Sequence, residues 1–227
     1  MSCSDAVSAV ALLLADSRFP AGGYAHSLGL EQAVSDGLGA DGVAPFIAAR
    51  LRLVARADAA LSVAARRAAA AGDDGELTLL DGEHAARCPS PVLRTIARRL
   101  GAQLLRSAAT AWPCATIDRY RALSATTPRP VALGVVGAAA GLDDVEVATI
   151  ALYDDAATVA SAALKLLGLD PAAAARWVAD LAPEIDAVAR ALVCDKRPIA
   201  EQPPPAAAGL ELAAAVHAAR MERFFAS

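Results

Sequence analysis

The sequence predicts an all-α protein that folds as a single globular domain of about ten helices. Hydrophobic residues make up 56% of the 227 residues, and many of them are alanine, the residue with the highest helix propensity. Aromatic residues contribute only 4%, and clusters of β-branched residues are few, which disfavours a sheet. High hydrophobicity with a formal net charge of −4 also excludes a disordered chain.

In the first half of the chain, apolar residues recur with helical spacing, and glycine-rich turns separate the helices. Three glycines at 37, 39 and 42 end the second helix, and residues 72–75 form a Gly-Asp-Asp-Gly turn. The predicted helices cover about 5–15, 26–36 and 43–71, and a short one runs from the turn to about 87.

In the second half, N-terminal capping signals mark the helix starts. Ser90-Pro91 and Asp170-Pro171 each place a capping side chain before a proline, and Asp143 with Glu146 has the spacing of a reciprocal cap. The predicted helices cover about 91–111, a segment starting near 113, 131–141, 143–167, and a segment from 171 that Pro183 breaks or kinks.

The last residues form a proline-rich linker, 201–205, followed by a helix over about 206–225. We therefore expect a core over 1–200 and a linker with a partner-binding helix over 201–227, within one domain. A narrow apolar seam follows this helix: Leu210, Ala214, His217, Met221 and Phe224. The seam either docks on the chain's own core or is offered to a partner.

Small residues are concentrated in the apolar helix 131–141, where Gly134, Gly137 and Gly141 are spaced for close helix packing. This pattern fits a core contact or a dimer contact. Because the whole chain also has more apolar surface than a monomer easily buries, we expect a symmetric homodimer.

The composition favours a cytoplasmic protein that binds neither nucleic acid nor membrane. The apolar stretch 7–15 has Asp5 where a signal peptide needs basic residues, and no small-residue cleavage site follows. The longest other uncharged apolar stretch, 131–142, has 12 residues, whereas a bilayer span needs about 20. The four cysteines show no CxxC pair, and the acidic balance lacks a basic stripe for phosphates.

Motifs of enzymes are missing from the sequence. Neither of the two lysines follows a glycine, which excludes a phosphate-binding loop, and HExxH and GxSxG do not occur. His84 and Cys88 have the spacing of two metal ligands on one helix face, but a proline follows Cys88. A solvent-exposed histidine beside a small apolar cysteine is the alternative, and the one we favour.

Two acidic pairs resemble parts of a metal-diphosphate site. Asp143-Asp144 and Asp154-Asp155 lie on one helix face but about 16 Å apart along the axis, too far for one metal cluster. We interpret them as a solvated face or a helix start. The sequence therefore predicts a protein without catalytic residues.

The segment 13–31 is unlike a generic helix. Pro20 fixes one φ angle, Gly22 and Gly23 permit a positive φ or a close backbone approach, and polar residues flank Tyr24. So many special residues in a loop indicate either demanding packing or a recognition surface.

This segment closely resembles the signature of the urease accessory protein UreF family, which reads Asp-Ser, Pro-x-Gly-Gly-[Phe/Tyr], two residues, and Ser-x-Gly-Leu-Glu. The C-terminal sequence Arg-Phe-Phe-Ala-Ser, 223–227, is similar to the ending of that family. The similarity is weaker in the middle of the chain, where Arg98-Arg99 lacks the usual glutamate and Gly168-Leu-Asp170 replaces a glutamine-containing segment.

The resemblance implies a non-enzymatic, all-α, homodimeric chaperone. Members bind UreD (UreH in some organisms) and recruit the GTPase UreG, and the complex delivers nickel to apo-urease. Nickel is thus the cargo, and no tightly bound cofactor is implied. The positions that match the family as partner-binding residues are Ser17, Gly22, Gly23, Tyr24, Ser27, Glu31, His217, Arg220, Arg223, Phe225 and Ser227.

Two other functions stay open from the residues themselves. The first is a generic helical adaptor whose N-terminal loop only packs. The second is an α-helical enzyme that uses the acidic pairs.

Overall fold

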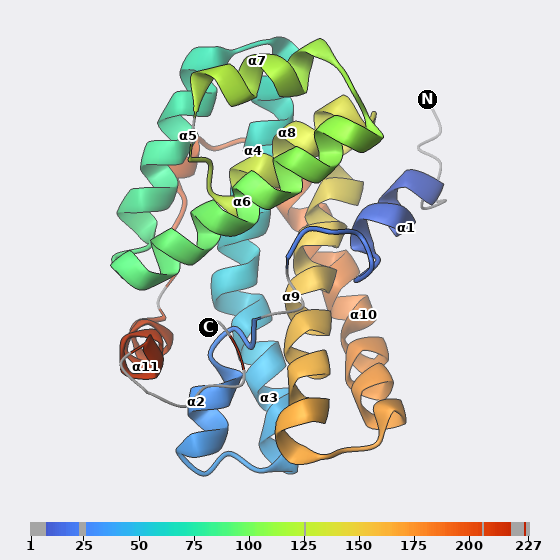
Figure 1. Ribbon diagram of the computed structural model, residues 1–227, viewed down its shortest axis with the longest axis vertical. Coiled ribbons are helices and arrows are strands. Elements are labelled where there is room, and N and C mark those ends of the chain that lie inside the picture. Colours follow the sequence, from blue (N-terminus) through green and yellow to red (C-terminus); the bar gives the residue numbers. More distant parts are fainter. Residues whose placement is uncertain (1–7, 23–25, 125, 206, 219–224, 226–227) are drawn as a thin grey trace.

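The computed structural model describes residues 8–22, 26–124, 126–205, 207–218 and 225. Every regular element in these ranges is a helix, which confirms the all-α prediction (Figure 1). The helices are α1 (Ala9–Ala15), α2 (Leu30–Ser35), α3 (Ala40–Arg50), a π-helical turn η2 (Leu51–Ala55), α4 (Arg56–Ala71), α5 (Asp74–Arg87), α6 (Pro91–Ala111), α7 (Ala115–Leu123), α8 (Arg129–Ala139), α9 (Asp144–Leu167), α10 (Pro171–Cys194), a 3-10 turn η3 (Ile199–Glu201) and α11 (Ala208–Ala218).

The core is built around α8, which packs against α4 and α6, while α9 packs against α4 and α10. Val131, Val135 and Val136 of α8 have no exposed surface. A Cβ atom on Gly134 would lie 2.3 Å from the Ser62 carbonyl oxygen of α4. Gly134 therefore makes the core contact, the first of the two predicted contacts, whereas no atom lies within 4 Å of a Cβ on Gly141.

The predicted capping signals begin the helices as expected. The Ser90 hydroxyl accepts the Leu93 N–H at 3.4 Å, and the Asp170 carboxylate accepts the Ala172 N–H at 2.9 Å. Asp143 and Glu146 form a complete reciprocal cap, with N–H to carboxylate distances of 2.8 and 3.0 Å. Because each cap satisfies otherwise unpaired N–H groups, these starts could be located from sequence.

Several element boundaries differ from the prediction. The helix predicted from 26 begins at Leu30, because Leu28 (φ 54°) and Gly29 (φ 91°) adopt the left-handed conformation that ends a turn. α3 begins at Ala40, three residues early, and includes Gly42. α10 continues through Pro183, so a break at that proline is wrong.

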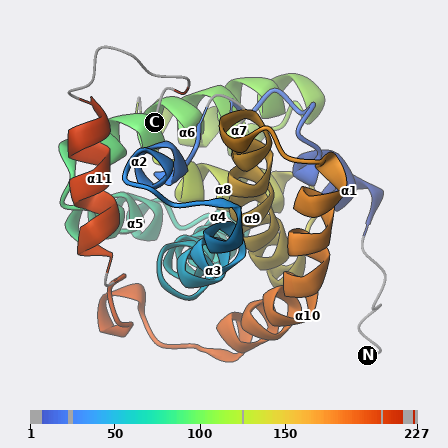
Figure 2. The same cartoon turned by 90° about the horizontal axis from the view of Figure 1, so that it is seen from below.

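The C-terminal helix α11 packs against α2 and α6 (Figure 2). Leu210 lies beside Gly29, and Ala214 is buried. These two seam residues dock on the chain's own core, the first of the two predicted alternatives. Met221, Phe224 and the side chain of His217 lie outside the described residues.

α9 has 24 residues and is long and apolar enough to cross a membrane by those two criteria, although the sequence pattern predicted no such helix. In its most apolar window, 50% of the residues are buried inside the molecule. A core helix meets the same criteria, and α9 packs against α1, α3, α4 and α10. Its apolar character therefore has an explanation in the fold itself.

Candidate partner-binding site

The N-terminal signature wraps from α1 towards α6. Phe19 packs against Trp112 with 5.7 Å between ring centroids, and the Ser107 hydroxyl donates to the Pro20 carbonyl at 2.7 Å. Ser17 is exposed in the turn after α1. Gly22 has a φ of 83°, and a Cβ there would lie 2.6 Å from Gln103 Oε1. The glycine therefore meets both conditions that the sequence suggested, a positive φ and a close approach.

Ser27 and Glu31 lie where α2 begins. Ser27 has no exposed surface, and its hydroxyl accepts the Glu31 N–H at 3.4 Å. Arg50 of α3 donates to the Leu28 carbonyl at 2.9 Å, inside the left-handed turn between them. A charged side chain of α3 thus holds this turn through a hydrogen bond to its backbone.

Arg50 is itself held by Asp155 of α9. Its Nε and Nη2 atoms lie 3.0 and 2.5 Å from the two carboxylate oxygens, and only 7% and 12% of the two side chains are exposed. Such a bidentate pair, shielded from water, fixes the orientation of the Arg50 guanidinium group and neutralises its charge. The start of α2 is therefore anchored to the core through one arginine.

The two ends of the resemblance meet at Glu31. Its Oε2 atom accepts the backbone N–H of Phe225 at 3.1 Å, across 194 residues of sequence. The Phe225 ring is buried, and the Lys165 ammonium lies 5.2 Å from its centroid. The structure thus joins the N-terminal signature, the C-terminal sequence and α9 in one place, which we call the terminal junction (Glu31, Lys165 and Phe225).

A groove of about 990 Å³ borders the terminal junction between α1, α9 and α10. Ser17, Lys165 and Phe225 line it. The exposed side chains of Leu12 and Tyr153 line it as well. Ser17 of the N-terminal signature therefore lines the same groove as Phe225 of the terminal junction.

The comparison with known proteins agrees with the resemblance. The UreF family profile matches residues 39–182, well over half of the chain. The urease accessory protein UreF of Mycobacterium sp. (strain JLS) is 41% identical over 182 residues, which cover 79% of this chain and 82% of that protein. The urease accessory protein UreF of Mycolicibacterium vanbaalenii is 40% identical over 168 residues, 72% and 75% of the two chains.

This chain belongs to the UreF family. The predicted resemblance is therefore confirmed, and its all-α fold agrees with the structure. The matched range of the UreF profile begins at residue 39 and ends at residue 182. The terminal junction thus joins two segments of this UreF protein that lie on either side of that range.

The predicted partner-binding residues divide into three groups. Ser27, Glu31 and Phe225 meet at or beside the terminal junction, and Ser17 shares its groove, whereas Gly22 faces α6. The backbone of His217 lies in the last turn of α11, and its side chain lies outside the described residues. Also outside them are Gly23, Tyr24, Arg220, Arg223 and Ser227.

Three residues of the site were not predicted from the sequence. Arg50 and Asp155 pair across 105 residues, and Lys165 reaches Phe225 from the middle of the chain. A signal for Arg50 did exist, because an arginine within an apolar helix needs an acidic partner or water.

The acidic pairs of this UreF protein are engaged with arginines rather than arranged for metal. Asp144 bonds Arg66 and Arg67, and Asp154 bonds Arg129 at 2.9 Å. The expectation of a solvated face is therefore wrong for Asp154 and Asp155, while Asp143 caps α9 as predicted. Among the described residues, no group of three or more His, Cys, Asp or Glu could hold a metal ion.

His84 is buried, which corrects the prediction of an exposed histidine. Burial, together with the charges of Arg98 and Arg94, lowers the pKa of His84 to about 4. Burial also raises the pKa of the Cys88 thiol to about 11. Because a metal ligand needs the thiolate, this pair is poorly suited to binding a metal at neutral pH.

Gly22→Ala is expected to lower the free energy of unfolding by about 1–3 kcal/mol, because alanine is strained at this φ and its Cβ would press on Gln103. Gly141→Ala is the matched control, since Gly141 has a φ of 77° but no atom within 4 Å of an added Cβ. Urea unfolding of both variants separates strain from contact. Equal losses in the two variants would show that the approach to α6 contributes nothing.

Proposed function

We propose that this UreF family member acts as the non-enzymatic adaptor of urease maturation. In this proposal it binds UreD (or UreH), recruits the GTPase UreG, and works in the cytoplasm as a homodimer within the complex that delivers nickel to apo-urease. Nickel is the cargo, and the chain itself holds no tightly bound cofactor. Any nucleotide chemistry belongs to the partner, since this sequence lacks a phosphate-binding loop.

The terminal junction is the observation that carries this proposal. A buried carboxylate fastens the C-terminal sequence to the start of α2, beside a groove with exposed Leu12 and Tyr153. Exposed apolar side chains next to such a built contact are typical of a surface that a partner covers. The relatives are named as urease accessory proteins, so we look for that partner among the proteins of urease maturation.

The proposal is tested by co-expression with UreD, UreG and the urease subunits. We expect the tagged chain to capture UreD and UreG, and light scattering to give the mass of a dimer for the free chain. Deleting the gene from a urease-positive strain should abolish urease activity, and the chain should restore it. A folded chain that captures neither partner would instead favour an adaptor outside urease maturation.

Glu31→Ala is expected to lower urease activation by about tenfold, because it removes the acceptor that holds the Phe225 N–H. Glu184→Ala is the control, since Glu184 pairs with the exposed Arg52 on the surface. Activation is measured in cell extract, and the melting temperature is recorded for both variants. Full urease activation by a folded Glu31→Ala variant would show that the terminal junction is not needed for the function.

A further inference from the structure

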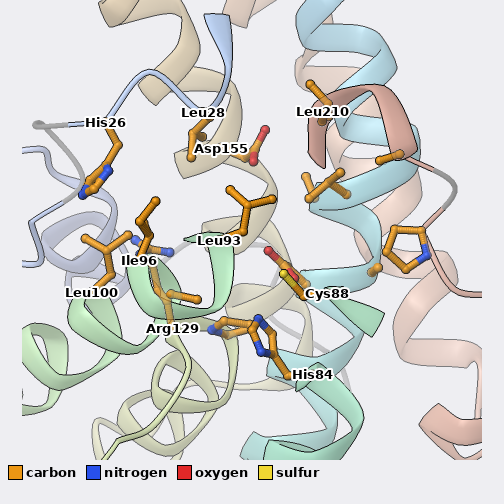
Figure 3. A pocket seen from close by; sticks show the side chains of 18 of the residues that line it. His26, Leu28, His84, Cys88, Leu93, Ile96, Leu100, Arg129, Asp155 and Leu210 are labelled. Atoms are coloured by element: carbon orange, nitrogen blue, oxygen red, sulfur yellow. The ribbon is translucent and has the colours of Figure 1, made fainter. Parts of the chain in front are cut away.

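A second cavity, of about 500 Å³, lies among α4, α6, α8, α9 and α11 (Figure 3). It shares His26, Asp154 and Thr158 with the lining of the groove beside the terminal junction. Its walls are mostly apolar, with Leu93 and Ile96 on α6 and Leu210 on α11. Cavities of roughly 300–1,000 Å³ with apolar walls and a few polar groups are those in which proteins bind small molecules.

Most of the basic side chains in its wall already have acidic or carbonyl partners. Arg50 pairs with Asp155 and Arg129 with Asp154. Arg87 donates to the backbone carbonyls of Ile199 and Gln202 and pairs with Glu83. The remaining lining arginine, Arg99, is exposed and is not among the charges that act on Asp58.

Asp58 of α4 is different from these residues. Within the described part of the chain, no side chain hydrogen bonds or ion pairs with its carboxyl group; the Ser62 hydroxyl donates only to its backbone carbonyl. Burial and the charge of Asp155 raise its pKa to about 7, although Arg50 and Arg129 act in the opposite direction. Asp58 is half-buried in the cavity wall, so a ligand in the cavity could reach its carboxyl group.

Apart from these arginines, the histidines and the cysteine among the described lining residues supply no cation at neutral pH. The imidazole of His84 is neutral and Cys88 is a thiol, since their pKa values are about 4 and about 11. Burial lowers the pKa of His26 as well. On α11, Glu211 adds a second acidic side chain to the lining.

We propose that this cavity binds a small organic cation with an apolar body, such as an arylalkylamine, and that Asp58 is its counter-ion. The apolar walls would enclose the body of the ligand, while the ammonium group would provide the charge-assisted partner that Asp58 lacks. This inference does not rest on the proposed function, because Asp58 and the apolar walls lie outside the terminal junction, although Arg50 and Asp155 of the partner-binding site also line the cavity.

The test compares 2-phenylethylamine with 2-phenylethanol, its neutral analogue of similar shape, by calorimetric titration of the full chain. We expect the amine to bind and the alcohol to bind at least about tenfold more weakly. Because the amine favours ionised Asp58, its affinity should rise by about tenfold from pH 6 to pH 8 and then level off. Protons should be released on binding near pH 7, which buffers of different ionisation enthalpy reveal.

Asp58→Asn keeps the shape of the side chain and removes its charge. This variant should lose the preference for the amine, the pH dependence and the proton release, while Asp118→Asn on the exposed surface of α7 changes none of them. Equal affinity for amine and alcohol, or no detectable binding of the amine at millimolar concentration, would overturn the proposal. That comparison uses the unmodified chain, so it decides the matter even if Asp58→Asn does not fold.

Discussion

Arg50→Met is expected to lower the free energy of unfolding by about 3–5 kcal/mol. The substitution keeps much of the side-chain length but leaves the Asp155 carboxylate, which is 12% exposed, without the arginine that neutralises it. It also removes the donor to the Leu28 carbonyl in the left-handed turn. The loss is measured by urea unfolding at pH 7.

Arg52→Met provides the matched control two residues away. Arg52 also pairs with a carboxylate, Glu184, but its side chain is 63% exposed, so its removal should cost less than about 1 kcal/mol. Arg50→Met combined with Asp155→Leu should recover part of the loss, because no charge is then left buried. Similar stability of Arg50→Met and Arg52→Met would mean that the Asp155 charge is well solvated without its partner.

Gly134→Ala is expected to cost about 2–4 kcal/mol and to separate α8 from α4. The added Cβ would lie 2.3 Å from the Ser62 carbonyl oxygen, 2.6 Å from the Ala65 Cβ and 2.6 Å from the Arg66 nitrogen. Two of these atoms belong to the α4 backbone, so no side-chain rotation relieves the overlap. Thermal unfolding followed by circular dichroism measures the effect.

Gly82→Ala in α5 should change stability in the opposite direction. Gly82 is exposed, and an added Cβ would meet no atom within 4 Å. The same substitution should therefore gain about 0.5–1 kcal/mol from helix propensity alone. A gain at both glycines would show that α4 and α8 can move apart at little cost.

The local features of this fold could be predicted from sequence. Apolar spacing located the helices, and the caps at Ser90, Asp143 and Asp170 located three of their starts, because each depends on residues within a few positions. The small residues of α8 predicted close packing. They could not identify α4 as the neighbour, since that contact depends on the whole topology.

The long-range contacts of the site could not be predicted. Asp154 and Asp155 look like a solvated pair in the sequence, and only the fold brings Arg129 and Arg50 to them. Glu31 and Phe225 were both predicted as partner-binding residues through the family resemblance, but nothing local indicates that they touch. The division into a core over 1–200 and a partner-binding tail over 201–227 stays a prediction.

The π-helical turn η2 affects the direction in which Arg50 and Asp58 point relative to each other. Arg50 and Asp58 are eight positions apart, which in a regular α-helix places them about 80° apart around the axis. A π-helical turn takes up one additional residue, which reduces that angle to about 20° and directs both side chains to the same cavity. A chain one residue shorter between these two positions could pass through the segment as a regular α-helix, because seven residues turn 700° and also leave the two side chains about 20° apart. The π-helical turn therefore absorbs one extra residue while both side chains still face the same cavity.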